Sequence, residues 1–270
     1  MDFMKSVSER MGSRKQPDVS QKDFEQIKVD GFNEAEGSLK YYDCPKCKNK
    51  GFIMRVEFNE ETQEYYSAGS ECSCMHIRRT MADAQKSGLG NYINMRIEDY
   101  KDLDQWQKNV KGKAVKYMGE DSDRWFVALG QSGSGKSMIC SIIANDLLLN
   151  KKKKVLYVTW TDFISKLKRD MMGDNTNEVS EYLEEIKNIE VLYLDEILKK
   201  YNETDLKYLV EIINHRYIND LKTIISSERL VDELLDIDEA TLGRAVEKSG
   251  EYLINIAKDR SKNYRLKGIM

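Results

Sequence analysis

A glycine-rich segment near the middle of the chain has the residue types and the spacing of a phosphate-binding loop. It matches the P-loop pattern at every fixed position, and an apolar run precedes it while a helical pattern follows it. Glycines let successive backbone N–H groups point inward, and the following helix adds the positive end of its dipole. We expect Lys136 to reach the β and γ phosphates of a nucleotide and the Ser137 hydroxyl to ligate Mg²⁺. The expected nucleotide-binding residues of this loop are Gly130, Gln131, Ser132, Gly133, Ser134, Gly135, Lys136 and Ser137.

Two carboxylates that could complete this site follow a second apolar run. Residues 191–194 have the pattern of a buried strand, and Asp195 and Glu196 come directly after it. In α/β proteins the carboxyl ends of the strands form the ligand-binding edge of the sheet. We expect Asp195 to hold Mg²⁺ through a water molecule and Glu196 to polarise the water that attacks the nucleotide. The alternative, that the two acids only cap the next helix, does not account for the P-loop upstream.

Four cysteines form two closely spaced pairs, with a hairpin-length segment between the pairs. In a reducing compartment such pairs indicate a metal site before they indicate disulfides, and four thiolates would form a closed, tetrahedral zinc site. His76 could replace one cysteine, although we favour four cysteines, and free buried thiols or a redox pair are the remaining alternatives. The fifth cysteine, Cys140, is expected in the core. The predicted zinc ligands are Cys44, Cys47, Cys72 and Cys74.

The elements that must position these groups follow from the hydrophobic pattern. Short apolar runs alternate with helical patterns in the second half of the chain, which predicts a parallel sheet covered on both faces. The predicted strands are residues 125–129, 155–158, 191–194, 223–225 and 252–254.

The first half of the chain has a different pattern. Residues 52–58 and the run through Tyr65 and Tyr66 predict a hairpin between the two cysteine pairs. Helices are predicted at residues 77–86, ending at residues 87–90, and at residues 103–118. The second of these helices would bury one face, consisting of Trp106, Val110, Ala114 and Met118.

Length and composition favour two domains. The 270 residues, 40% of them hydrophobic and 33% charged, can bury one α/β core and a smaller attachment. No apolar run approaches the roughly 18 residues that span a bilayer, and residues 1–18 lack the apolar core of a signal peptide. We therefore expect a cytoplasmic protein without a membrane partner. The net charge of −3 argues against a protein that coats DNA duplexes, and the lysine run at residues 151–154 is interpreted as a solvated connection.

From Trp125 onward the chain resembles the AAA+ ATPase domain of DnaC/DnaI-type helicase loaders and of the related IstB-type transposition ATPases. The resemblance covers more than half of the chain and rests on residues 130–137, 194–196, 211–217, 223–228, 233–235 and 243–244. The cysteine pairs and residues 87–89 resemble the N-terminal half of loaders of Gram-positive bacteria and their phages. IstB-type proteins are expected to begin with helices, so the resemblance favours a loader.

The resemblance implies further site residues. Ser227 lies at the tip of the sensor-1 strand, where the family usually has an asparagine, and it is therefore expected to contact the nucleotide. Arg244 resembles the arginine finger that reaches the γ-phosphate of a neighbouring subunit, with a surface arginine as the alternative. Arg260 lies where a sensor-2 arginine would be, and little chain remains to form the usual helical lid. The predicted catalytic residues are thus Glu196, Lys136 and Arg244.

The resemblance also predicts the function and the domains. It implies a slow, partner-stimulated and Mg²⁺-dependent ATPase that loads a hexameric replicative DNA helicase onto single-stranded DNA, with ATP, Mg²⁺ and Zn²⁺ as cofactors. Self-association is expected when the protein is bound to ATP and the helicase. The alternatives are an IstB-like helper of DNA transposition and a zinc adaptor that does not hydrolyse ATP. The expected α/β chain has a helicase-interaction region at residues 1–86 with a zinc ribbon at about 41–76, a helical linker at 87–122, and an AAA+ ATPase domain at 123–270.

Overall fold

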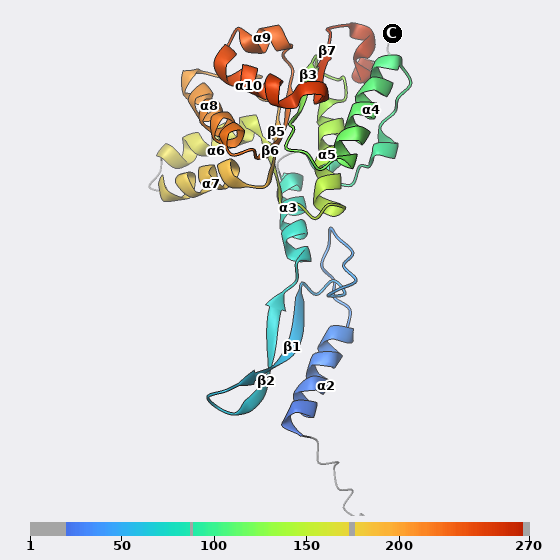
Figure 1. Ribbon diagram of the computed structural model, residues 1–270, viewed down its shortest axis with the longest axis vertical. Helices are drawn as coiled ribbons and strands as arrows, with labels where there is room; N and C mark the ends of the chain where they lie inside the picture. Colours follow the sequence, from blue (N-terminus) through green and yellow to red (C-terminus); the bar gives the residue numbers. More distant parts are fainter. Residues whose placement is uncertain (1–19, 87–88, 173–175, 267–270) are drawn as a thin grey trace, which may run out of the picture. The chain divides into compact units, whose positions relative to one another are not determined.

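The computed structural model describes residues 20–86, 89–172 and 176–266, and the chain divides into two compact units, residues 1–78 and 79–270 (Figure 1). The first unit contains a two-stranded sheet and the second a five-stranded sheet. This confirms the predicted α/β fold with a small cysteine-bearing unit at the N-terminal side. Ser87 and Gly88, at the predicted end of a helix, lie outside the described residues. Among the helices that the structure describes, none is long and apolar enough to cross a membrane.

The first unit is a helix packed against a β-hairpin. Strands β1 (Phe52–Asn59) and β2 (Glu64–Glu71) pair antiparallel along their whole length, which confirms the predicted hairpin. Helix α2 (Gln21–Glu34) contacts both strands. Its Asn33 side chain donates to the carbonyl oxygen of Met54, at 2.9 Å, and accepts the Met54 N–H at 3.0 Å. Both backbone groups of one strand residue are thereby satisfied by a single amide, which fixes the helix against the hairpin.

The second unit is built on a parallel sheet with the strand order β4-β5-β6-β3-β7. The central strand β3 pairs with β6 on one side and with β7 on the other. Because all five strands run in the same direction, the carboxyl ends of β3, β5 and β6 meet at one edge. The strands are β3 (Phe126–Gly130), β4 (Val155–Thr159), β5 (Val191–Asp195), β6 (Lys222–Ser227) and β7 (Leu253–Ile256).

Helices cover both faces of this sheet. Figure 1 shows α4 and α5 on one side and α6, α7, α8 and α10 on the other. The helices are α3 (Cys74–Lys86), α4 (Gln105–Gly119), α5 (Lys136–Leu149), α6 (Trp160–Met172), α7 (Thr176–Asn188), α8 (Glu203–Ile218), α9 (Val231–Leu235) and α10 (Glu239–Ser249). Short 3-10 helices are η1 (Gly90–Tyr92), η2 (Ile97–Asp99), η3 (Gly250–Tyr252), η4 (Arg260–Lys262) and η5 (Tyr264–Leu266).

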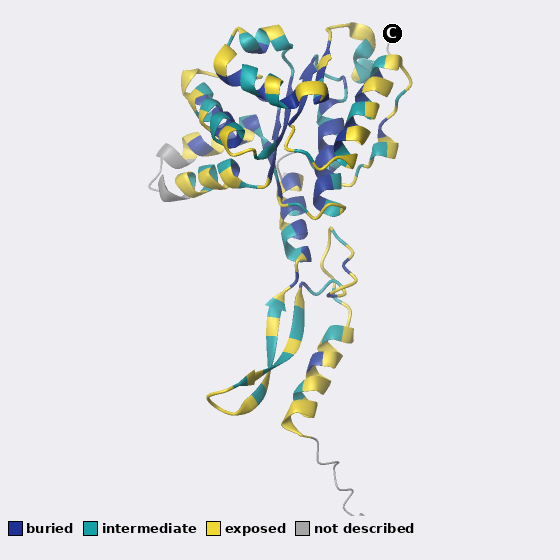
Figure 2. Cartoon of the chain, in the orientation of Figure 1, coloured by how far each residue is buried: buried dark blue, intermediate teal, exposed yellow. Residues whose placement is uncertain are grey.

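Buried residues concentrate in the strands and on the helix faces that contact them, as Figure 2 shows. Arg216 of α8 is a fully buried charge within this core. Its guanidinium donates to the hydroxyl of Thr223 and to the carbonyl oxygens of Ile186, Lys187, Ile189 and Lys222. These bonds connect the end of α7 with the start of β6, so Arg216 satisfies carbonyl groups at the helix end that have no partner within the helix.

Helix α4 differs from the predicted helix in its start and in its buried face. It begins at residue 105, which leaves Leu103 outside it and 70% exposed. Trp106 and Met118 are only partly buried, because the helix is rotated so that Tyr117 packs edge-on against Phe126 and Tyr252. The stabilisation from these aromatic contacts determines which face of α4 is buried, and this face differs from the one that the four-residue spacing of apolar residues predicted. The buried side chains of the helix are Gln107, Val110, Ala114 and Tyr117.

Candidate functional site

The glycine-rich loop joins the end of β3 to the start of α5, as the P-loop pattern requires. Gly133 and Gly135 have φ values of 77° and 83°, in the left-handed region where a side chain would be strained. Lys136 is the first residue of α5 and is only 7% exposed, and its Nζ donates to the carbonyl oxygen of Gln131 at 2.6 Å. Burial lowers the pKa of Lys136. A buried ammonium beside loop N–H groups is an environment that favours an anion, so the residues fit a nucleotide phosphate.

The first predicted acid, Asp195, lies at the centre of a hydrogen-bond network at the end of β5. Its Oδ1 accepts the Ser137 hydroxyl at 2.9 Å, the Tyr193 hydroxyl at 2.7 Å and the Ser226 hydroxyl. Asp195 is 5% exposed, and the three hydroxyl donors offset the cost of burying its carboxylate. The structure thus brings together the two residues that were predicted to hold Mg²⁺, Ser137 and Asp195.

The second acid, Glu196, has a strained backbone and an accessible carboxylate. Its φ is 56°, in the left-handed region that is rare for a residue with a side chain, and its N–H donates to the Ser226 hydroxyl at 3.0 Å. The carboxylate forms an ion pair with Lys199 at 3.1 Å. Ser226 therefore connects the backbone of Glu196 to the carboxylate of Asp195, and Glu196 projects into the cavity beside the P-loop.

A cavity of about 340 Å³ lies over the P-loop. Its size and its mixture of aromatic and charged residues suit a small organic anion. It brings together the P-loop and Glu196 with residues of the segment before α4 and of the C-terminal segment. The lining residues are Tyr92, Asp99, Tyr100, Lys101, Ser132, Gly133, Gly135, Lys136, Ser137, Met138, Glu196, Glu228, Tyr264 and Arg265.

The C-terminal segment lies along the P-loop. The N–H of Tyr264 donates to the carbonyl oxygen of Gly133 at 2.9 Å, and a Cβ on Gly133 would lie 2.0 Å from the side chain of Asn263. Arg265 lines the cavity, with its Nη1 3.5 Å from the Ser132 hydroxyl. Arg260, at the predicted sensor-2 position, is exposed and does not line this cavity. Its neighbour Asp259 does bond to the loop residue Gln131, but the arginine of this segment that lines the cavity is Arg265.

Ser227 occupies a different position from the one predicted for a residue that senses the nucleotide. It is fully buried and its hydroxyl donates to the carbonyl oxygen of Ile197 at 2.9 Å, while the next residue, Glu228, lines the cavity. The strand alternates sides, so Ser226 points to Asp195 and Ser227 points into the loop after β5. In this structure Ser226 is the serine of β6 that contacts the acid pair.

Arg244 lies on α10 and contacts α8. Its Nη1 donates to the side-chain oxygen of Asn214, and its guanidinium lies 5.7 Å from the ring centre of Tyr217. Arg244 is partly exposed and does not line the cavity over the P-loop of its own chain. Action on a neighbouring subunit stays a prediction for this residue.

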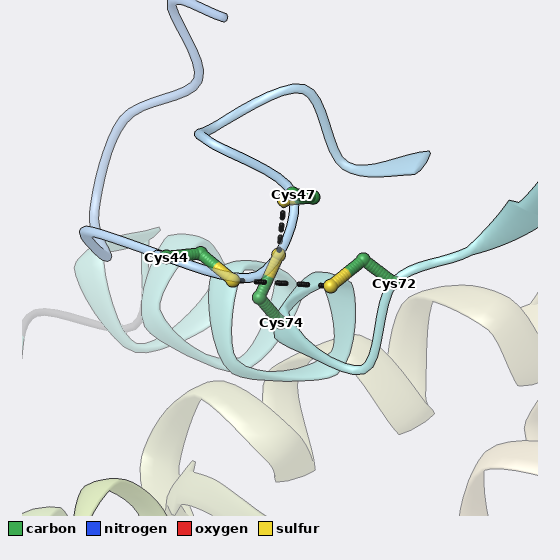
Figure 3. A group of neighbouring side chains, drawn as sticks. All are labelled: Cys44, Cys47, Cys72 and Cys74. Atoms are coloured by element: carbon green, nitrogen blue, oxygen red, sulfur yellow. Dashed lines mark hydrogen bonds between the residues drawn. The ribbon is translucent and has the colours of Figure 1, made fainter. Parts of the chain in front are cut away.

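The four cysteines of the first unit come together at one point, and His76 is not part of the group (Figure 3). All four sulfur atoms lie within 4.8 Å of one another, with 3.8 Å between Cys44 and Cys72 and 3.5 Å between Cys47 and Cys74. Tetrahedral zinc with four thiolates at its usual bond length has sulfur atoms roughly 3.8 Å apart. The cluster therefore fits a zinc ribbon, as predicted. Cys140 is buried in the core, as expected.

The surroundings of the cysteines shift their pKa values in both directions. Burial raises the pKa of Cys72, and it raises that of Cys74 to about 12. Burial alone would raise the pKa of Cys47, but the N–H of Gly51, 3.3 Å from its sulfur, and the neighbouring thiols lower this pKa to about 7. Arg78 is 5% exposed, and its terminal nitrogens donate to Asn49 and to the Lys40 carbonyl oxygen; its guanidinium counteracts part of the rise in the pKa of Cys74. Its Nε has no hydrogen-bond partner among the described residues. A buried guanidinium at this place supplies charge that would offset four thiolates bound to a divalent metal.

Sequence reasoning missed Tyr100, Ser226, Arg78 and Arg265 as site residues. Tyr100 and Arg265 lie outside the motifs, in segments whose sequence carries no nucleotide-binding pattern. Ser226 and Ser227 are adjacent serines, and only the register of β6 against β5 distinguishes them. For Arg78 a signal existed, because it lies four residues after Cys74 and therefore on the same helix face.

Comparisons with known proteins agree with this geometry. The family model of the bacterial DnaA ATPase domain matches residues 109–246, just over half of the chain. The phage-like element PBSX protein XkdC of Bacillus subtilis is 25% identical, over 87% of this chain and 90% of its own. The replicative helicase loader DnaC of Escherichia coli is 32% identical over 130 residues, which are 47% of this chain and 51% of DnaC.

A solved structure of the replication initiator DnaA, bound to AMPPCP and single-stranded DNA, shares the fold with a TM-score of 0.52. It is 18% identical and covers 66% of this chain and 55% of DnaA. With a parallel sheet, a P-loop and an acid pair in the arrangement described above, the second unit has the AAA+ fold that the sequence predicted. The chain therefore belongs to the family of the bacterial DnaA ATPase domain, with an ATPase domain similar to that of DnaC and a four-cysteine unit before it.

Proposed function

We propose that this protein is an ATP-dependent loader that places a hexameric replicative DNA helicase onto single-stranded DNA. The observation that carries the proposal is the arrangement of Lys136, Asp195 and Glu196 at one sheet edge, in a domain that is similar to a named helicase loader. The structure of DnaA bound to single-stranded DNA supports single-stranded DNA as a ligand of this protein, because DnaA shares this fold. PBSX protein XkdC supports a phage-associated setting.

The side chains at the nucleotide site divide phosphate binding, Mg²⁺ binding and orientation of the water molecule among them. The buried Lys136 and the loop N–H groups bind the phosphates, while Ser137 and Asp195 hold Mg²⁺. Mg²⁺, when bound, neutralises charge on the β and γ phosphates. Glu196 orients the attacking water, and its backbone is held in place by Ser226. ATP acts mainly as a switch, so turnover is slow and rises when the helicase and DNA are bound.

The four-cysteine unit serves as the helicase-binding part of the protein. Residues 1–86 contact the helicase, and one zinc ion per chain holds residues 41–76 in their fold through Cys44, Cys47, Cys72 and Cys74. Residues 87–122 act as the linker to the ATPase domain at 123–270. Self-association occurs in the complex with ATP and helicase, where Arg244 reaches the nucleotide of a neighbouring subunit. Metal analysis of protein purified under reducing conditions checks the zinc content.

The nucleotide roles are separable by mutation. Lys136→Ala is expected to weaken ATP binding, because it removes the buried charge that faces the phosphates, whereas Glu196→Gln is expected to preserve binding and stop hydrolysis. Binding is measured by titration calorimetry, and hydrolysis is measured with and without single-stranded DNA and a host helicase. Equal loss of binding in the two variants would contradict the assigned roles.

The loading step has its own assay. The protein is mixed with the purified helicase and a single-stranded DNA circle, and the helicase retained on the DNA is measured with ATP and without it. Wild-type protein is expected to increase the retained helicase only with ATP, and Lys136→Ala protein is expected to have no effect. If wild-type protein binds and hydrolyses ATP but retains no helicase on DNA, it is an ATPase with a different partner.

A further inference from the structure

Tyr100 has a buried hydroxyl that forms no hydrogen bond to any residue in the described part of the chain. The residue follows η2, is 2% exposed, and lines the cavity over the P-loop. Its backbone is held in place, since its N–H donates to Ile97 at 3.2 Å and its carbonyl oxygen accepts Lys111 Nζ at 3.1 Å. Its side-chain oxygen, in contrast, has no hydrogen-bond partner among the residues that the structure describes. Buried hydroxyls are usually bonded, so this one calls for an explanation.

The ring of Tyr100 lies directly against the phosphate-binding loop. A Cβ built on Gly135 would lie 3.4 Å from the ring and 3.8 Å from the hydroxyl oxygen. Gly135 is the last loop residue before Lys136, at the start of α5, where backbone N–H groups gather for a phosphate. The unpaired hydroxyl is thus at the phosphate end of the cavity.

The hydroxyl has the chemistry of a hydrogen-bond donor at this place. Burial raises the pKa of Tyr100, so the hydroxyl keeps its proton at neutral pH. Phosphate oxygens only accept hydrogen bonds, and they accept strongly because they are charged. The Lys136 ammonium nearby favours such an anion, as does the positive end of α5.

We propose that the Tyr100 hydroxyl donates a hydrogen bond to a phosphate oxygen of the bound nucleoside di- or triphosphate, an inference that rests on the proposed nucleotide site. Tyr100 is then a phosphate-binding residue outside the P-loop and the acid pair. It lies before α4, in the N-terminal part of the second unit. Nucleotide binding therefore satisfies a buried group of this segment as well as those of the core.

Tyr100→Phe tests the proposal, because it removes only the oxygen. Full-length variant and wild type are titrated with ATP, ADP and adenosine, adenosine by competition with a fluorescent ATP analogue. Affinity for ATP and for ADP is expected to fall about 10-fold or more, as for the loss of a hydrogen bond to a charged acceptor, while adenosine affinity stays the same. The melting temperature of the nucleotide-free variant is expected to be no lower than that of wild type, since the hydroxyl bonds to none of the described residues and so loses no such bond.

Tyr117→Phe is the matched control. The Tyr117 hydroxyl is equally buried, but it donates to the carbonyl oxygen of Arg124 at 2.9 Å and lies outside the cavity. This variant is expected to melt at a lower temperature than wild type and to bind ATP with wild-type affinity.

The outcomes separate the inference from the proposed function. Wild-type affinity of Tyr100→Phe for ATP overturns the inference and leaves the proposed function standing. Equal weakening for ATP, ADP and adenosine overturns it too, because the hydroxyl would then contact the base or the ribose. If wild-type protein itself binds no nucleotide, both the inference and the proposed function fail.

Discussion

Ser226 offers the sharpest test of how the site is assembled, because one hydroxyl connects both acids. In Ser226→Ala the Asp195 carboxylate loses one of its three hydroxyl donors and keeps those of Ser137 and Tyr193. The N–H of Glu196, now bonded at 3.0 Å, is left without its acceptor. A hydrogen bond to a charged group contributes about 1.5–3 kcal/mol, and a buried unpaired N–H costs about 1–3 kcal/mol.

These figures predict two separate effects. The free energy of unfolding of Ser226→Ala is expected to fall by about 2–4 kcal/mol, since local relaxation recovers part of the loss. ATP hydrolysis per folded molecule is expected to fall about 10-fold or more, because the strained backbone of Glu196 is no longer anchored and a small displacement of a catalytic group is costly. ATP affinity should stay within about 3-fold of wild type, since among the described residues the Ser226 hydroxyl forms no hydrogen bond to Lys136 or to the loop.

Ser227→Ala is the control, with an equally buried serine one residue further along β6. Its hydroxyl bonds to the Ile197 carbonyl oxygen and touches neither acid. Chemical denaturation, calorimetric ATP titration and phosphate release are measured for both variants. We expect Ser227→Ala to lose stability with little change in hydrolysis. The reasoning is refuted if Ser227→Ala loses as much hydrolysis as Ser226→Ala, or if Ser226→Ala weakens ATP binding as strongly as Lys136→Ala.

Two further predictions concern the cysteine unit and the subunit contact. Arg78→Met should weaken zinc affinity about 10- to 100-fold, measured in competition with a chelating dye, because it removes a group that supports the metal ligands. Arg79→Met, at an exposed position next to it, should leave zinc affinity unchanged. Similar zinc affinities in the two variants would exclude charge compensation by Arg78. Arg244→Lys should be almost as inactive as Arg244→Ala, because lysine cannot bond bidentately to phosphate, and both should still bind ATP. Mixing Arg244→Ala with Lys136→Ala protein should partly restore ATPase activity if the arginine acts in trans, and mixed assemblies without activity would place its action within one subunit.

The sequence by itself determined the parts of the site that are contiguous in the chain. The P-loop, the Asp195-Glu196 pair and the two cysteine pairs were all identified from spacing, because their geometry depends on a few neighbouring backbone angles. The buried strands were recognisable for a related reason. A strand covered on both faces must be continuously apolar, and this leaves a pattern that needs no knowledge of its neighbours.

Only the tertiary structure decided which residues from distant segments meet at that site. Strand register selected Ser226 over Ser227, and the path of the C-terminal segment placed Arg265 rather than Arg260 in the lining of the cavity. Aromatic packing of Tyr117 set the rotation of α4 against its apparent periodicity. The tertiary structure likewise places the Tyr100 hydroxyl, which bonds to none of the described residues, next to Gly135 of the P-loop. Contacts of this kind depend on how whole elements pack, and packing is determined by all the residues of an interface together, so no local spacing encodes it.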